Sequence, residues 1–222
     1  MKGKHANLIL KLDLEMAFDK LEWSFIRESL IFFNFPMKLT NLIMSCVSTS
    51  SISILVNGGK FDFFNPSRGI RQGDPMSPYL FIIYMERLSR AINVEVQKKA
   101  WYPIKITTRG PRLSHLFFAD DPTLFAKANT QNYHTILTTM SNFCKSSGQS
   151  IKYGKSKIIF SADFKEENAS KCSNILNIKT SDSFGKYLGF PIIHSKRTHK
   201  DFQFIIDSMN SRLEAGKLTS ST

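Results

Sequence analysis

Two adjacent carboxylates, Asp120 and Asp121, are the side chains of this sequence best placed to do chemistry. Apolar runs at 113–118 and 124–126 flank them, which predicts a strand, a tight turn and a second strand with both acids at the hairpin tip. Crowded carboxylates repel each other, and a divalent cation between them relieves the repulsion. Their hard oxygens are the ligands that Mg²⁺ prefers. Taken alone, however, an Asp-Asp pair is most often a solvated turn.

A third carboxylate, Asp13, ends another predicted strand at 8–14. An acid on such an apolar strand is costly to bury without a partner. If this strand and the 113–126 hairpin are neighbours in one sheet, the three carboxylates converge. They would then form a two-metal site suited to in-line phosphoryl transfer. The sequence permits this convergence without establishing it.

A Gly- and Pro-rich stretch, 68–78, lies between these acids along the chain. Its glycines allow the backbone to approach a ligand closely. Gln72 is able to hydrogen-bond a base or sugar, while Arg68 and Arg71 are suited to phosphates. The alternative is a surface loop that caps the helix predicted after it.

Helices and antiparallel hairpins alternate through most of the chain, and 42% hydrophobic residues are enough to build a core. This predicts an α+β fold in which helices back one face of an antiparallel sheet. Residues after about 180 look like an appendage to that sheet. The predicted helices are 23–33, 39–47, 79–98, 132–145, 166–176 and 198–213; the predicted strands are 8–14, 51–56, 60–64, 104–107, 113–126, 156–161 and 186–193.

The formal net charge of +12 favours a polyanionic partner, most simply nucleic acid, although a basic soluble protein is the alternative. Cys46, Cys144 and Cys172 are far apart, so neither a disulfide framework nor a zinc site is expected, and a reducing compartment fits best. The longest apolar run, 80–85, is too short to span a bilayer. The basic N-terminus lacks the apolar core of a signal peptide. An intracellular protein without a membrane partner is therefore expected.

Several motifs together resemble a known family. Asp13 with Phe18, the block 71–78 and the block 118–121 are similar, in order and spacing, to the palm motifs of reverse transcriptases. The resemblance is greatest to LINE-type (non-LTR) retrotransposon enzymes of the plant type. It continues through 147–151, 155–157 and 186–191, so that it covers nearly the whole chain.

The resemblance implies catalytic roles for individual residues. Asp13 and Asp120 would hold two Mg²⁺ ions, for which Mn²⁺ could substitute, and Asp121 would support the same site. Phe18 would be a steric gate whose ring occupies the space of a ribose 2′-OH. Lys155 matches the lysine that protonates the leaving pyrophosphate, and its alternative is a solvated basic turn.

The resemblance also implies contacts to substrates. Gln72 and Gly73 would lie near the incoming dNTP and the template. Tyr187-Leu188-Gly189 matches a primer-grip hairpin, although an ordinary buried strand also fits these residues. The expected nucleic-acid contacts are Arg68, Arg71, Tyr187, Leu188 and Gly189.

The implied fold is a polymerase palm with a partial thumb and without fingers. Residues 1–180 would be the palm, and 181–222 would hold the primer-grip hairpin and the start of a thumb with a degraded C-terminus. The implied function is RNA-directed DNA polymerisation, in which dNTPs are added to the 3′-OH of a DNA primer on an RNA template. Nuclear residence is expected of such an enzyme.

Some positions depart from the family pattern. Pro122 follows the acid pair directly, and a proline removes a backbone donor and is tolerated mainly at sheet edges or bulges. Lys152 stands where the family often has Asn, and the pattern fades after Glu214. The chain therefore looks like a partial copy, and an inactive remnant that binds nucleic acid non-specifically is the main alternative. An RNA-dependent RNA polymerase palm is a weaker one, which Phe18 argues against.

Overall fold

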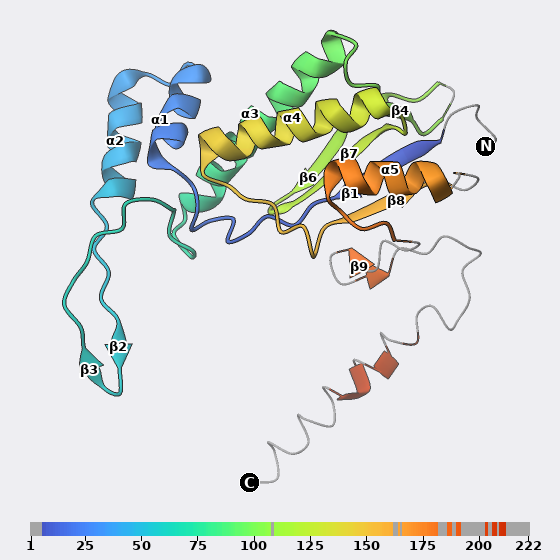
Figure 1. Ribbon diagram of the computed structural model, residues 1–222. Coiled ribbons are helices and arrows are strands. Elements are labelled where there is room, and N and C mark those ends of the chain that lie inside the picture. The colour runs from blue at the N-terminus through green and yellow to red at the C-terminus, as the bar shows by residue number, and fades with distance from the viewer. Residues whose placement is uncertain are drawn as a thin grey trace. The chain divides into compact units, whose positions relative to one another are not determined.

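The computed structural model describes residues 6–107, 109–161, 164, 166–181, 186–187, 190–191, 203, 206–207 and 209–211 (Figure 1). The chain forms two compact units, Met1–Asp182 and Ser183–Thr222. Within the described residues, no helix is long and apolar enough to cross a membrane. The assignment of the two units as palm and start of thumb stays a prediction.

A four-stranded antiparallel sheet is the centre of the first unit. Its strands are β1 (Asn7–Lys11), β6 (His115–Phe118), β7 (Asp121–Lys127) and β8 (Lys157–Phe160). Their order is β6-β7-β1-β8, so that β1 pairs with β7 on one side and with β8 on the other. More than a hundred residues separate β1 from β7 along the chain, and the sheet therefore unites distant segments.

Helices α3 (Ser77–Gln97), α4 (Thr130–Ser147) and α5 (Glu166–Leu176) lie along one face of this sheet (Figure 1). Beside them, α1 (Trp23–Phe32) packs on α3 and α4, and α2 (Met37–Ser48) packs on α1. Both ends of α4 are capped. At its N-terminus the Asn129 side chain accepts a hydrogen bond from the Asn132 N–H, and at its C-terminus Gly148 adopts the left-handed conformation. Pro78 lies in the first turn of α3, as the sequence predicts.

Burial alternates along β1, as a strand with one covered face requires. Leu8 and Leu10 are fully buried, while Ile9 and Lys11, which alternate with them, are half-buried on the opposite face. The core continues from these leucines into α1, α3 and α4. The predicted α+β fold, an antiparallel sheet backed by helices on one face, is thus confirmed. The largest fully buried side chains are Trp101, Tyr84, Leu8, Leu10, Leu12, Leu21, Ile26, Leu30, Leu88, Ile92, Leu124 and Ile136.

The hairpin predicted from 51 to 64 is present, but its ladder is short. Its strands β2 (Leu55–Val56) and β3 (Gly59–Lys60) have two residues each, and an isolated bridge joins Ile52 to Phe64. The apolar side chains of both strands are exposed, so neither face of this hairpin is buried against the rest of the protein. A second short pair, β4 (Ile104–Lys105) with β5 (Arg112–Leu113), precedes β6.

The second unit contains a two-stranded antiparallel pair, β9 (Lys186–Tyr187) and β10 (Phe190–Pro191). The single strand predicted at 186–193 is therefore wrong, because Lys186 pairs with Pro191 and Tyr187 pairs with Phe190. Leu188 and Gly189 lie outside the described residues. The helix predicted at 198–213 is described at 203, 206–207 and 209–211, which are helical, and its other residues lie outside the description.

Candidate functional site

The acid pair lies at the tip of the β6–β7 hairpin, where the sequence predicts it. Phe118 and Asp121 are the last paired residues, so Ala119 and Asp120 form a two-residue turn. Ala119 has a φ of 48°, the positive value that such tight hairpin turns require. Asp120 is exposed and Asp121 is half-buried at the start of β7. Both carboxylates are therefore accessible from solvent.

Replacing Ala119 by glycine is expected to stabilise the protein by about 1 kcal/mol, because alanine is strained at positive φ and glycine is not. The midpoint of urea-induced unfolding, measured for wild type and Ala119→Gly, checks this. A matched Ala17→Gly variant should instead be destabilised, because Ala17 is not among the residues with positive φ and its methyl group is buried. A lower midpoint for Ala119→Gly would contradict the strained turn.

Asp13 follows β1 on the face that the helices leave open. The Leu12 N–H donates to the Pro122 carbonyl over 3.0 Å, which extends the β1–β7 register beyond Lys11. One further step of this register places Asp13 opposite Asp121, and opposed residues of an antiparallel pair share a face. Lys11 Nζ lies on that face 3.6 Å from Asp121 Oδ1. The first strand and the hairpin are thus neighbours, as the metal-site hypothesis requires.

The oxygens of Asp13, Asp120 and Asp121 are suitable ligands for a divalent cation, and Asp13 and Asp121 share one face of the sheet. Within the described residues, however, no three His, Cys, Asp or Glu side chains are grouped closely enough to hold a metal ion. Mutual repulsion keeps acidic side chains apart when no cation lies between them, and Lys11 already pairs with Asp121. The convergence of Asp13, Asp120 and Asp121 on two ions therefore stays a prediction.

Pro122 does not lie at a sheet edge or in a bulge. It is the second residue of β7, which has β6 on one side and β1 on the other. Its carbonyl accepts the Leu12 N–H, but its ring nitrogen has no hydrogen to return the bond. The sheet tolerates this loss because the position is next to the turn, where the ladder ends.

Segment 152–156 is hydrogen-bonded to the backbone of Asp13. The Asp13 N–H donates to Ser156 Oγ over 3.1 Å, and the Lys152 N–H donates to the Asp13 carbonyl over 2.8 Å. Lys155 lies in the exposed turn between these two contacts. The fold thus brings Lys155 to the Asp13 end of the sheet, where a leaving-group acid would be needed.

Phe18, five residues after Asp13, is half-buried at the junction of two loops and α3. Its ring stacks on Phe81 with centroids 4.7 Å apart and an interplanar angle of 9°. Its carbonyl accepts the Ile70 N–H over 2.9 Å. The structure therefore fixes the ring and the backbone of the predicted steric gate.

The loop around 68–76 is docked against the segment that carries Phe18. The Gly69 N–H donates to the Leu21 carbonyl and the Trp23 indole donates to the Gly69 carbonyl, each over 2.7 Å. Ile70 is buried, whereas Arg68 lies 3.8 Å from Glu22 in an exposed ion pair. The backbone at 69–70 is therefore held against segment 18–23. The predicted contact residues Arg71, Gln72 and Gly73 are exposed.

Sequence reasoning gave no role to the residues that follow α4. Ser150 Oγ donates to Glu15 Oε2 over 2.8 Å, and Lys20 Nζ donates to Ser150 Oγ over 2.7 Å. The hydrogen bond from Lys20 and that from Ser150 lower the pKa of Glu15. Gln149 Nε2 donates to the Ala17 carbonyl over 2.6 Å. The available signal in the sequence was the pair Gln149-Ser150, two hydrogen-bonding residues directly after Gly148, which ends the helix.

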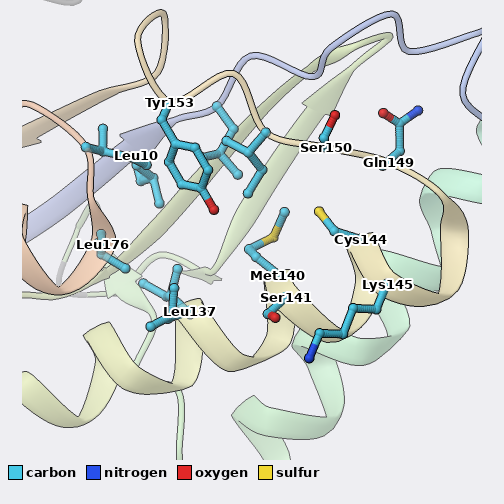
Figure 2. Close-up of a pocket in the computed structure, with 14 residues that line it drawn as sticks. Leu10, Leu137, Met140, Ser141, Cys144, Lys145, Gln149, Ser150, Tyr153 and Leu176 are labelled. Carbon is cyan, nitrogen blue, oxygen red and sulfur yellow. The ribbon is translucent and has the colours of Figure 1, made fainter.

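A cavity of about 380 Å³ lies on the other side of β1 (Figure 2). Leu10 and Leu12 line it, together with Met140, Cys144 and Tyr153. Because the leucines belong to the helix-covered face, this cavity is separate from the face that holds the carboxylates. It is therefore not the candidate site.

Comparison with known proteins defines the class of this chain. Residues 1–192 match the family "Reverse transcriptase (RNA-dependent DNA polymerase)", and the chain belongs to that family. Family and fold support RNA-directed DNA polymerisation as the function of the class. Reverse transcriptases generally use divalent metal ions, which agrees with a carboxylate donor set.

Relatives include proteins of R2 retrotransposable elements, which are non-LTR elements. The chain is 28% identical over 193 residues to the retrovirus-related Pol polyprotein from type-2 retrotransposable element R2DM of Drosophila melanogaster, and 29% identical over 143 residues to that from type-1 element R2 of Popillia japonica. These alignments cover 82% and 64% of this chain but 17% and 22% of the relatives. A 67-residue stretch is 43% identical to an uncharacterised mitochondrial protein of Arabidopsis thaliana, covering 30% of this chain and 55% of that protein.

Solved structures of telomerase have a similar fold. Telomerase from Candida tropicalis in complex with a fragment of telomeric RNA superposes with a TM-score of 0.57 at 14% identity, over 72% of this chain and 26% of that chain. The apo enzyme truncated from its C-terminal domain gives 0.56 at 16% identity, over 74% and 32%. The chain thus has a polymerase palm-like fold.

Proposed function

We propose that this chain is the palm of an RNA-directed DNA polymerase, with Asp13 and Asp120 as metal ligands and Asp121 in support. The observation that carries the proposal is the β1–β7 register, which brings the end of β1 beside the acidic hairpin tip on the open face of the sheet. Two Mg²⁺ ions, or Mn²⁺, would stabilise the attacking and leaving oxygens of an in-line displacement.

The reaction joins a primer 3′-OH to the α-phosphorus of a dNTP and releases pyrophosphate. Lys155 donates a proton to that leaving group from the turn beside Asp13. Phe18 excludes a ribose 2′-OH by bulk, which selects dNTPs over NTPs. Ordered packing of its ring on Phe81 supports this role, because a gate has to be rigid to discriminate.

An RNA template and a DNA primer are the proposed partners, and the net charge of +12 supports binding to their phosphates. Gln72 and Gly73 lie in an exposed part of the loop that docks beside Phe18, so they are accessible to the incoming nucleotide and the template. The proposed nucleic-acid contacts are Arg68, Arg71, Tyr187, Leu188 and Gly189.

Primer extension tests the proposal. The purified chain would be given poly(rA)/oligo(dT), dTTP and Mg²⁺ or Mn²⁺, in parallel with a double variant, Asp120→Ala and Asp121→Ala. We expect extension by the wild type and none by the double variant. Extension that is equal in the two proteins, or absent from both, would remove the catalytic assignment for this chain.

A non-catalytic remnant is the second candidate. The observation in its favour is that the described carboxylates form no closed ligand group and that Lys11 pairs with Asp121. A remnant would bind the primer–template duplex with the same affinity in the wild type and the double variant, and this affinity would fall steeply with salt. Such binding without extension would select this second candidate.

A further inference from the structure

Gln149 is a buried polar residue in which the amide nitrogen is hydrogen-bonded and the amide oxygen is not. Its side chain is 4% exposed, and its Nε2 donates to the Ala17 carbonyl over 2.6 Å. Its Oε1 is also buried and accepts no hydrogen bond within the described part of the chain. The Tyr84 hydroxyl, which also interacts with the Gln149 side chain, donates to the Ser147 carbonyl over 3.5 Å. In Figure 2 the Gln149 amide points away from Cys144 and the cavity.

An unpaired buried amide oxygen destabilises a fold, because the oxygen gives up its hydrogen bonds to water and gains none. A methionine has the same length, carries no such oxygen and fills a core equally well. Packing alone therefore does not account for glutamine at this position. Its Nε2 donation to the Ala17 carbonyl is a contact that a methionine cannot make.

The Ala17 carbonyl is the peptide oxygen directly before Phe18. Phe18 is then held a second time, by the Ile70 N–H on its own carbonyl, and a third time, by the stack of its ring on Phe81. Gln149 thus holds the peptide before Phe18, while the stack on Phe81 holds the ring. Gln149 belongs to the segment that follows α4, whereas Ile70 belongs to the loop around 68–76.

We propose that Gln149 is a positioning residue for the steric gate: its amide holds the Ala17–Phe18 peptide, and this hold keeps the Phe18 ring where it excludes a ribose. The inference deepens the proposed function and rests on the gate role of Phe18. It assigns to a buried residue outside the predicted site a share in selecting deoxynucleotides over ribonucleotides.

Steady-state incorporation by the full chain tests the proposal, with kcat and KM measured separately for dTTP and UTP on poly(rA)/oligo(dT). Gln149→Met should raise the relative efficiency with UTP by about tenfold. It should change kcat for dTTP by less than about twofold, since no group that touches the reacting atoms is altered. Phe18→Val is the positive control. Gln131→Met is the matched negative control, because Gln131 also donates Nε2 to a backbone carbonyl, that of Lys99, but from an exposed site.

Hydrogen exchange supplies a second readout that needs no catalysis. The Ile70 amide, bonded to the Phe18 carbonyl, should exchange faster in Gln149→Met than in Gln131→Met. An unchanged exchange rate of the Ile70 amide would overturn the inference about Gln149, whether or not the chain is active. Absence of primer extension would instead refute the proposed function and would leave the exchange result to decide the role of Gln149. An unchanged UTP-to-dTTP ratio in an active Gln149→Met enzyme would also overturn it, since Phe18→Val reports independently on the gate.

Discussion

Asp13→Asn is expected to lower the rate of primer extension by at least about a thousandfold, equivalent to roughly 4 kcal/mol of transition-state stabilisation. The substitution keeps the shape of the side chain and removes the charge that a divalent cation requires. It leaves the fold intact, because the contacts of Asp13 to Ser156 and Lys152 are made by its backbone. The loss should therefore come from chemistry and not from unfolding.

Asp62→Asn is the matched control for this prediction, because Asp62 is an exposed acid of the β2–β3 hairpin region, away from the open face of the main sheet. Its rate should equal that of the wild type. Mn²⁺ binding, followed by electron paramagnetic resonance, should weaken in Asp13→Asn and not in Asp62→Asn. Equal Mn²⁺ affinity and equal extension in both variants would show that Asp13 is not a metal ligand.

Gly148→Ala is expected to destabilise the protein by about 3 kcal/mol, the largest effect on stability that we predict for a single methyl group. Gly148 has a φ of 80°, which strains any L side chain. An added Cβ would also lie 2.6 Å from the Lys20 carbonyl oxygen, a backbone atom that cannot turn away. Gly69→Ala should behave similarly, because its Cβ would lie 2.7 Å from the Asp19 carbonyl oxygen.

Gly73→Ala separates the cost of positive φ from the cost of the close Cβ contact. Gly73 has a φ of 89° but no heavy atom within 4 Å of an added Cβ, so only the cost of positive φ remains, about 1 kcal/mol. Urea unfolding of the three variants would measure the difference. Equal losses for Gly148→Ala and Gly73→Ala would mean that the contact between the end of α4 and segment 20–22 is not close. The prediction matters for function because this contact lies within the segment that carries Phe18.

Local patterns determined several features of this protein in advance. Apolar runs on either side of Asp120-Asp121 were enough to predict the β6–β7 hairpin with its acids at the tip. A glycine after a periodic apolar segment marked the end of α4, and Ser-Pro marked the start of α3. These signals succeed because turn and cap preferences act between residues that are close in sequence. The resemblance in motif order then indicated the reverse transcriptase family, which the comparisons confirm.

The tertiary structure decided which of these elements meet. No local pattern states that β1 pairs with β7 in a register that carries Asp13 toward Asp121, because that pairing depends on two hydrophobic faces joining the same core. The docking of Gly69 and Gln149 on segment 17–21 is equally non-local, and it was missed. Pro122 shows the converse, since a residue expected at edges or bulges is held inside the sheet by the strand pairing around it. Sequence therefore specified the chemical groups and their turns, and long-range packing specified the face on which they gather.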